Sequence, residues 1–132
     1  MTAKEYWNKA EQLRKRINRK IHEIHILRQR AEGMNGSSMN DMPKTVSLNP
    51  HKMEGTVFKI MTLEQEIKET QLELDNLIHE MYGRIKRIED EDVRDILTKR
   101  YIEFKPWKMI ASEMFICERQ AYYLHDKAIV LL

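Results

Sequence analysis

Most features of a disulfide-stabilised, membrane-spanning or secreted protein are missing from this chain of 132 residues. A single cysteine excludes an internal disulfide and fits a reducing cytosol. No apolar run reaches the roughly eighteen residues that a transmembrane helix needs. The N-terminus also lacks the apolar core of a secretion signal. We therefore expect a cytoplasmic protein that does not associate with membranes.

Patterns that carry catalysis are absent as well. The four glycines form no phosphate-binding loop, no serine lies in a nucleophile elbow, and no carboxylates are paired in an apolar setting. His22 and His25 have the spacing of metal ligands on a helix, but no second Cys or His pair answers them. We predict no metal site and no cofactor, and we do not expect an enzyme.

Charged residues make up 33% of the chain and the mean hydropathy is −0.65, so any apolar core must be thin. Apolar residues recur every three or four positions in 1–32 and in 50–90, which predicts two long amphipathic helices. The first stripe comprises Tyr6, Ala10, Leu13, Ile17, Ile21, Ile24, Leu27 and Ala31. The second comprises Met53, Val57, Ile60, Leu63, Ile67, Leu74, Leu77, Met81, Ile85 and Ile88, with a polar gap at Thr70 and Gln71.

Local signals predict where these helices begin and end. Thr2 and Glu5 form a capping box that starts the first helix. Gly33 is its predicted end, because glycine accepts the left-handed conformation that commonly terminates a helix. Gly83 predicts a kink or break near the end of the second helix, since glycine costs about 1 kcal/mol relative to alanine inside a helix.

The segment 33–49 separates the two helices. It is rich in Gly, Ser, Asn and Met and has no periodicity, which indicates a flexible linker. Asn49 and Pro50 then suit the cap and the first position of the second helix. The linker is long enough for the second helix to fold back on the first as an antiparallel hairpin. Pairing between subunits would bury the same stripes, so a dimeric coiled coil stays an alternative.

Charge differs between the two helices. Residues 1–32 hold nine basic and four acidic side chains, whereas 56–90 hold five and eight, so the helices attract one another. The basic cluster 14–20 has two interpretations: it clamps phosphates, or it forms salt bridges with the acidic second helix. The matching acidic side chains would be Glu64, Glu66, Glu69, Glu73 and Asp75.

The last forty residues carry most of the functional information. Three short amphipathic stretches follow one another: 92–101, 106–114 and a third that starts near Cys117. Only Phe115, Ile116 and Cys117 separate the second stretch from the third. Helices joined by so short a turn cross at a large angle, as in a helix-turn-helix. One face of the second stretch holds Trp107, Ile110, Ala111 and Met114, and one face of the third holds Ala121, Leu124, Ala128 and Leu131.

The outer face of the third stretch is the candidate site. Tyr122 and Tyr123 diverge by about 100° on a helix, so both cannot be core. Side chains of arginine, glutamine and tyrosine can contact phosphates and base edges. We therefore predict DNA contacts by Arg119, Gln120, Tyr122 and Tyr123, with Lys105, Lys108 and Lys127 on the phosphate backbone.

Three runs in this part of the chain, 96–102, 107–114 and 119–128, resemble region 4 of bacterial sigma factors. More narrowly, the chain is similar to small late-gene regulators of phages of Gram-positive bacteria, the ArpU and RinA type. The resemblance implies a transcription regulator of phage or prophage genes in a bacterial cell. It implies double-stranded DNA as a partner, with RNA polymerase as a further candidate. It also places Arg119, Tyr122 and Tyr123 at base-facing positions.

The expected organisation is therefore an all-α chain with a long helical hairpin or coiled coil ahead of a helix-turn-helix module. Its segments are 1–32, 33–49, 50–90 and 91–132. The last segment holds seven basic and seven acidic residues, so strong DNA binding needs a dimer, a partner or the basic first helix. Neutral charge and Glu118 favour one alternative, a protein-interaction adaptor that does not bind DNA. Ring assembly would favour another, a packaging component such as a small terminase subunit.

Overall fold

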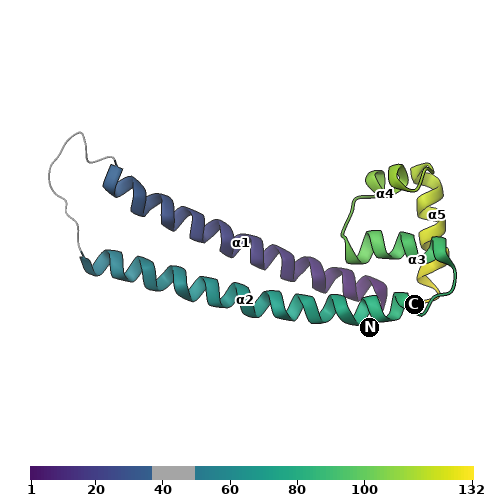
Figure 1. Ribbon diagram of the computed structural model, residues 1–132, viewed down its shortest axis with the longest axis horizontal. Coiled ribbons are helices and arrows are strands. Elements are labelled where there is room, and N and C mark those ends of the chain that lie inside the picture. The colour runs from purple at the N-terminus through teal and green to yellow at the C-terminus, as the bar shows by residue number, and fades with distance from the viewer. Residues whose placement is uncertain (37–49) are drawn as a thin grey trace. The chain divides into compact units, whose positions relative to one another are not determined.

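The computed structural model describes residues 1–36 and 50–132, and every regular element in them is a helix, which confirms the all-α class. The elements are α1 (Ala3–Gly36), α2 (Pro50–Lys86), α3 (Glu91–Leu97), a π-helical turn (Thr98–Ile102), α4 (Trp107–Glu113) and α5 (Glu118–Ile129) (Figure 1). No helix in these two ranges combines the length and the apolar character needed to cross a bilayer.

Backbone packing divides the chain into two compact units. One unit is Leu13–Leu72 and contains most of α1 and the first part of α2. The other joins Met1–Gln12 to Glu73–Leu132, so it contains the first turns of α1, the end of α2 and all of α3, α4 and α5. Sequence periodicity did not indicate that the first twelve residues belong with the C-terminal helices.

Within Leu13–Leu72, α1 and α2 form the antiparallel hairpin that the sequence predicted. Lys20 pairs with Glu66 at 2.9 Å and Arg28 pairs with Glu64 at 2.9 Å, so rising numbers in α1 meet falling numbers in α2. Both pairs are partly exposed and contribute about 0–1 kcal/mol each. Burial of the apolar stripes contributes more, about 1.5–3 kcal/mol for each large side chain removed from water. The buried members are Leu13, Ile17, Ile24 and Leu63.

Three positions of the stripes differ from the prediction. Ile21 and Val57 were predicted to belong to the core, and this prediction is wrong. Ile21 is 51% exposed and Val57 is 55% exposed. Conversely Thr70, in the predicted polar gap, is only 6% exposed. Its hydroxyl donates to the backbone oxygen of Glu66 at 2.8 Å, and this bond lets the threonine be buried without an unsatisfied polar group.

The start of α1 agrees with the sequence and its end does not. The amide of Glu5 donates to Thr2 Oγ1 at 3.2 Å, and the amide of Thr2 donates to a Glu5 carboxylate oxygen at 3.4 Å, which confirms the capping box. The helix continues past Gly33 to Gly36, so the predicted end at Gly33 is wrong. Glycine weakens a helix interior by about 1 kcal/mol, which the neighbouring turns can tolerate.

The second helix begins at Pro50, as predicted. The predicted cap Asn49 and most of the predicted linker, 37–49, lie outside the described residues. The prediction of a break at Gly83 is wrong, because α2 continues through Gly83 to Lys86. Gly83 is exposed, and a Cβ at this position would meet no group within 4 Å outside the helix's own backbone, so no packing demand distorts the helix there.

The unit that contains the C-terminal helices has the tighter core. Its largest fully buried side chains are Tyr6, Met81, Ile85, Ile96, Leu97 and Ile110. Asp90 caps α3 by accepting from the amides of Asp92 at 3.0 Å and Val93 at 3.3 Å. Arg84 on α2 donates to the backbone oxygens of Met1 at 2.9 Å and Leu132 at 2.7 Å. These bonds hold together segments that are distant in the sequence.

Candidate nucleic-acid interface

Helices α4 and α5 form the predicted helix-turn-helix. They pack against one another, and α3 packs against α5. Ile110, Ala111, Ala121 and Ala128 are at most 4% exposed, which confirms these members of the predicted faces, whereas Trp107, Met114 and Leu124 are partly buried. Small alanine side chains at both helices allow a close approach, because the distance between helix axes depends on the side chains at the contact.

The turn between these helices is a Schellman motif that ends α4. The amide of Phe115 donates to Ser112 O at 3.3 Å, and the amide of Ile116 donates to Ala111 O at 3.0 Å. Phe115 has a φ of 58°, the left-handed conformation that favours glycine and costs another residue about 1–2 kcal/mol. Its side chain is 95% exposed, so packing does not repay this cost.

The predicted contact residues of α5 all lie on its surface. Tyr122 is 47% exposed and Tyr123 is 59% exposed, which confirms that the two side chains cannot both be core. Exposed side chains at the same helix also include Arg119, Gln120 and Lys127. Glu118 and Asp126 are exposed on this helix too, so carboxylates interrupt the face.

The two tyrosines of α5 have different neighbours. The ring of Tyr122 lies 4.9 Å from the ring of Trp107 on α4, measured between centroids. The Lys127 ammonium lies 4.5 Å from the centroid of the Tyr123 ring. Tyr122 is thus held by an aromatic contact between the two helices, whereas Tyr123 is stabilised within α5 by a cation–π contact.

Two of the predicted lysines lie outside α5. Lys105 Nζ is 2.7 Å from a Glu113 carboxylate oxygen and 3.5 Å from Glu103, and Lys99 also reaches Glu113 at 3.3 Å. The hydrogen bond between Lys105 and Glu113 raises the pKa of Lys105 and lowers the pKa of Glu113. A phosphate would have to replace these carboxylates at Lys105. Lys108 on α4 is exposed and forms no ion pair among the described residues.

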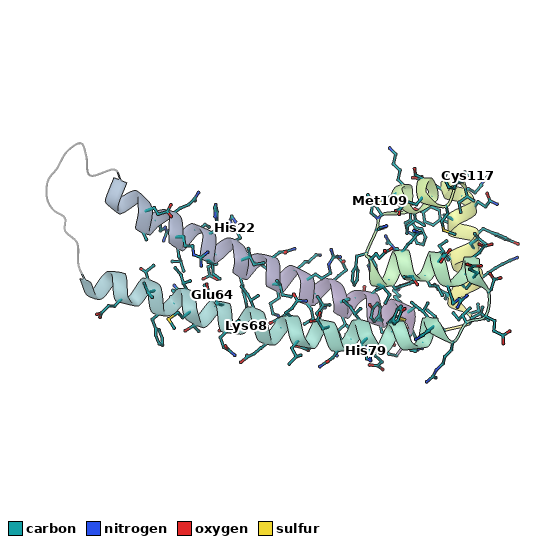
Figure 2. The ribbon with its side chains drawn as sticks, in the orientation of Figure 1. His22, Glu64, Lys68, His79, Met109 and Cys117 are labelled. Atoms are coloured by element: carbon teal, nitrogen blue, oxygen red, sulfur yellow. The ribbon has the colours of Figure 1, made fainter. Side chains whose placement is uncertain are left out.

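One detail of the module differs from the sequence interpretation, and it concerns the end of α5. At the other helix, Pro106 occupies the N-cap position of α4 and the helix begins at Trp107. Leu131 lies beyond the end of α5 and is 61% exposed, so its predicted core role is wrong. Cys117, labelled with Met109 in Figure 2, is the exposed N-cap of α5 and its side chain makes no capping hydrogen bond.

The side chain of Arg100 lies between those of Trp7 and Trp107, an arrangement that we call the indole–arginine stack. The guanidinium carbon of Arg100 is 4.1 Å from the Trp7 ring and 4.7 Å from the Trp107 ring. Arg100 also donates to the backbone oxygen of Lys105 at 3.0 Å. Burial lowers the pKa of Arg100, but a guanidinium stays protonated in proteins.

Two hydrogen bonds connect the start of α1 to α5 through Tyr101, in the π-helical turn. The hydroxyl of Tyr6 donates to Tyr101 O at 2.7 Å. The hydroxyl of Tyr101 lies 2.6 Å from His125 Nε2. Burial raises the pKa of both tyrosines. Sequence analysis missed this connection. Its only signal was that Trp7, one of the chain's two tryptophans, lies beside the apolar stripe rather than on it.

His125 gives the module a stability that depends on pH. Burial lowers the pKa of His125 below its ordinary value of about 6.5, although Asp126 opposes the shift; the charge of Arg100 adds to it. The unfolded chain therefore binds more protons just below pH 6.5. The stability is present above this value and is lost as the pH falls toward the lowered pKa.

We accordingly expect the free energy of unfolding to decrease between about pH 7 and pH 5, and this decrease to be smaller in His125→Gln. Urea unfolding followed by circular dichroism across this range measures the effect. His79→Gln is the control, because His79 is exposed on α2 in the same unit. An unchanged pH dependence in His125→Gln would contradict the assignment.

Comparison with protein-family models, with curated proteins and with solved structures finds no match to this chain. The surface of α5 offers a guanidinium and a carboxamide, which can form paired hydrogen bonds with guanine and adenine edges, and two phenols that can bind phosphate.

Proposed function

We propose that this protein is a sequence-specific DNA-binding transcription regulator that inserts α5 into the major groove of double-stranded DNA. The observation that carries the proposal is the Schellman turn between α4 and α5, together with the exposed Arg119, Gln120, Tyr122 and Tyr123. A helix-turn-helix presents its second helix in this manner, and the first residues of that helix contact base edges. Lys108 and Lys127 are the predicted phosphate contacts, with Lys105 once its carboxylates are displaced.

The resemblance to sigma region 4 and to the phage late-gene regulators extends this proposal. On that basis the regulated genes belong to a phage or prophage in a bacterial cell, RNA polymerase is a candidate partner, and the protein acts as a dimer. A dimer would also double the number of phosphate contacts, which helps a module of balanced charge.

A second function, the protein-interaction adaptor, is favoured by one feature of the site. Glu118 and Asp126 are exposed on α5, where their carboxylates repel phosphate. The salt bridges of Lys105 with Glu103 and Glu113 also reduce the positive charge available to DNA. Binding to duplex DNA at low salt separates the adaptor from the regulator.

Selection of full-length protein on a random-sequence duplex library tests the proposed function. We expect one sequence motif to be enriched, and Arg119→Ala/Tyr123→Ala to bind the selected site at least about 10-fold more weakly, since each base contact contributes about 1–3 kcal/mol. The matched control is Lys86→Ala/Tyr82→Ala, a cation and a tyrosine with the same spacing on the exposed surface of α2. Equal loss in both variants, or no duplex binding at about 50 mM salt, would reject the regulator.

A further inference from the structure

The part of α1 within Leu13–Leu72 carries more positive charge than the hairpin uses. Residues 13–32 contain seven basic side chains and two acidic ones, Glu23 and Glu32. Lys20 and Arg28 are engaged by Glu66 and Glu64. Four other cations of this stretch, Lys15, Arg16, Arg19 and Arg30, are exposed and can contact another molecule.

Most of this excess lies on one side of α1, which we call the basic face (Lys15, Arg16, Arg19 and Arg30). All four side chains are exposed, and none pairs with a carboxylate among the described residues. Lys15, Arg19 and His22 follow the spacing i, i+4, i+7, so they share a helix side. His22 points away from α2 in Figure 2. The basic face is thus directed away from the acidic side chains of α2.

The packing of α1 does not require this concentration of charge. The core of the hairpin uses the opposite side of the helix, where Ile17 and Ile24 are buried. Like charges at i and i+4, as in Lys15 and Arg19, destabilise a helix by about 0.2–0.5 kcal/mol per pair. The one bond at Arg19 is a long one, from Nε to the backbone oxygen of Lys15 at 3.4 Å. A polyanion would remove this repulsion.

We infer that the basic face binds the phosphate backbone of double-stranded DNA as a second contact surface in addition to α5. The inference rests on the proposed function, and it supplies the positive charge that 91–132 lacks. Lys15 and Arg19 lie about 6 Å apart along a straight helix, a separation that suits successive phosphates better than a single small anion. Two of the three cations Lys15, Arg16 and Arg19 are arginines, whose planar guanidinium groups match the geometry of phosphate.

The chemistry of the surface favours a nucleic acid over an acidic protein. Protein interfaces have an apolar centre with a polar rim. Between Lys15 and Arg19 the only apolar side chain is Ile17, which is buried in the hairpin, and the other intervening residues are the exposed Arg16 and Asn18. The exposed carboxylate of Glu23 lies one turn after Arg19 on this side of the helix, so the cations outnumber the carboxylates four to one. A surface with this excess of cations and without an apolar centre binds through charge, which is the mode of phosphate contacts.

The test compares two full-length variants that lose the same charge. Lys15→Gln/Arg16→Gln/Arg19→Gln neutralises the basic face, and Lys59→Gln/Lys68→Gln/Lys86→Gln neutralises three exposed cations of α2. Affinity for duplex DNA is measured from about 50 to 200 mM salt, where each phosphate contact contributes about 0.9 to the slope of log affinity against log salt. Circular dichroism establishes that both variants keep the wild-type helix content.

In the first variant we expect the slope of log affinity against log salt to be smaller than in the wild type by about 2–3. Over this fourfold range of salt, the difference corresponds to roughly a 40-fold change in affinity. The α2 variant should keep the wild-type slope to within about one contact. Equal slopes in the wild type and the first variant would overturn the inference. Equal losses in both variants would also overturn it, because they would indicate an effect of net charge rather than of this surface.

The outcomes separate this inference from the proposed function. If a selected site loses binding in Arg119→Ala/Tyr123→Ala while the basic-face variant keeps its slope, the regulator stands and the inference fails. If the protein binds every duplex with the same affinity and only the basic-face variant shows a smaller salt slope, the inference stands and the proposed sequence-specific regulator fails. If the wild type binds no duplex at about 50 mM salt, both fail and an acidic protein becomes the partner of the basic face.

Discussion

Replacing Ile110 with alanine is expected to lower the free energy of unfolding by about 3 kcal/mol, because it leaves a cavity in the centre of the helix-turn-helix. Ile110 is 0% exposed on α4, and its backbone oxygen accepts from the amide of Met114 at 3.0 Å at the end of that helix. Because Ile110 is closed to solvent, water does not replace the contacts that the removed methyl and methylene groups made. The short helix has few other apolar side chains with which to compensate.

The neighbouring residue provides the control for this variant. Met109 is on the same helix and 48% exposed, so Met109→Ala should change the free energy of unfolding by no more than about 0.5 kcal/mol. Urea unfolding followed by tryptophan fluorescence is suitable, since Trp7 and Trp107 both lie in the unit that contains α4. Similar losses in the two variants would mean that α4 is not packed through the Ile110 face.

Helical periodicity was sufficient to predict the helices and their burial where one helix face alone determines burial. On α4 and α5 the spacing of Ile110, Ala111, Ala121 and Ala128 identified residues that are at most 4% exposed. The same spacing left Tyr122 and Tyr123 outside the core, as the structure has them. The capping box at Thr2 was also predictable, because its two hydrogen bonds involve residues three apart.

Periodicity failed where helix geometry or distant packing determines the environment. Ile21 and Val57 fit the stripes but are exposed, since a stripe does not specify whether the facing helix has a partner at that level. Leu131 continues the spacing of α5 beyond the point where the helix ends. The left-handed Phe115 was unpredictable too, because phenylalanine has no preference for that conformation.

The indole–arginine stack could not be predicted, because it joins residues almost a hundred positions apart. Arg100 belongs to the π-helical turn Thr98–Ile102, a widened turn that the apolar pattern does not reveal. Such turns are frequent at functional sites. Here the turn contains both Arg100, which contacts Trp7 and Trp107, and Tyr101, which contacts His125. The candidate site therefore depends on α1 as well as on the last forty residues.

Removing the Trp7 side chain is expected to cost about 2–3 kcal/mol of unfolding free energy. A fully buried tryptophan would cost about 3–5 kcal/mol, and Trp7 is only partly buried. The loss includes the cation–π contact with Arg100 at 4.1 Å and the edge contact with Tyr101 at a centroid distance of 5.9 Å. Asn8→Ala, at the exposed neighbouring position, should change the free energy of unfolding by less than about 0.5 kcal/mol.

A double-mutant cycle between Trp7→Ala and Arg100→Gln separates the stack from simple loss of volume. Because the two side chains are in contact, the double variant should lose about 1 kcal/mol less than the sum of the single losses. Circular dichroism is the appropriate signal, since Trp7→Ala removes one of the two fluorophores. Additive losses would show that the guanidinium contributes independently of Trp7. A Trp7→Ala loss no larger than that of Asn8→Ala would detach the start of α1 from the module, and with it the hydrogen bonds that connect Tyr6 to His125 through Tyr101.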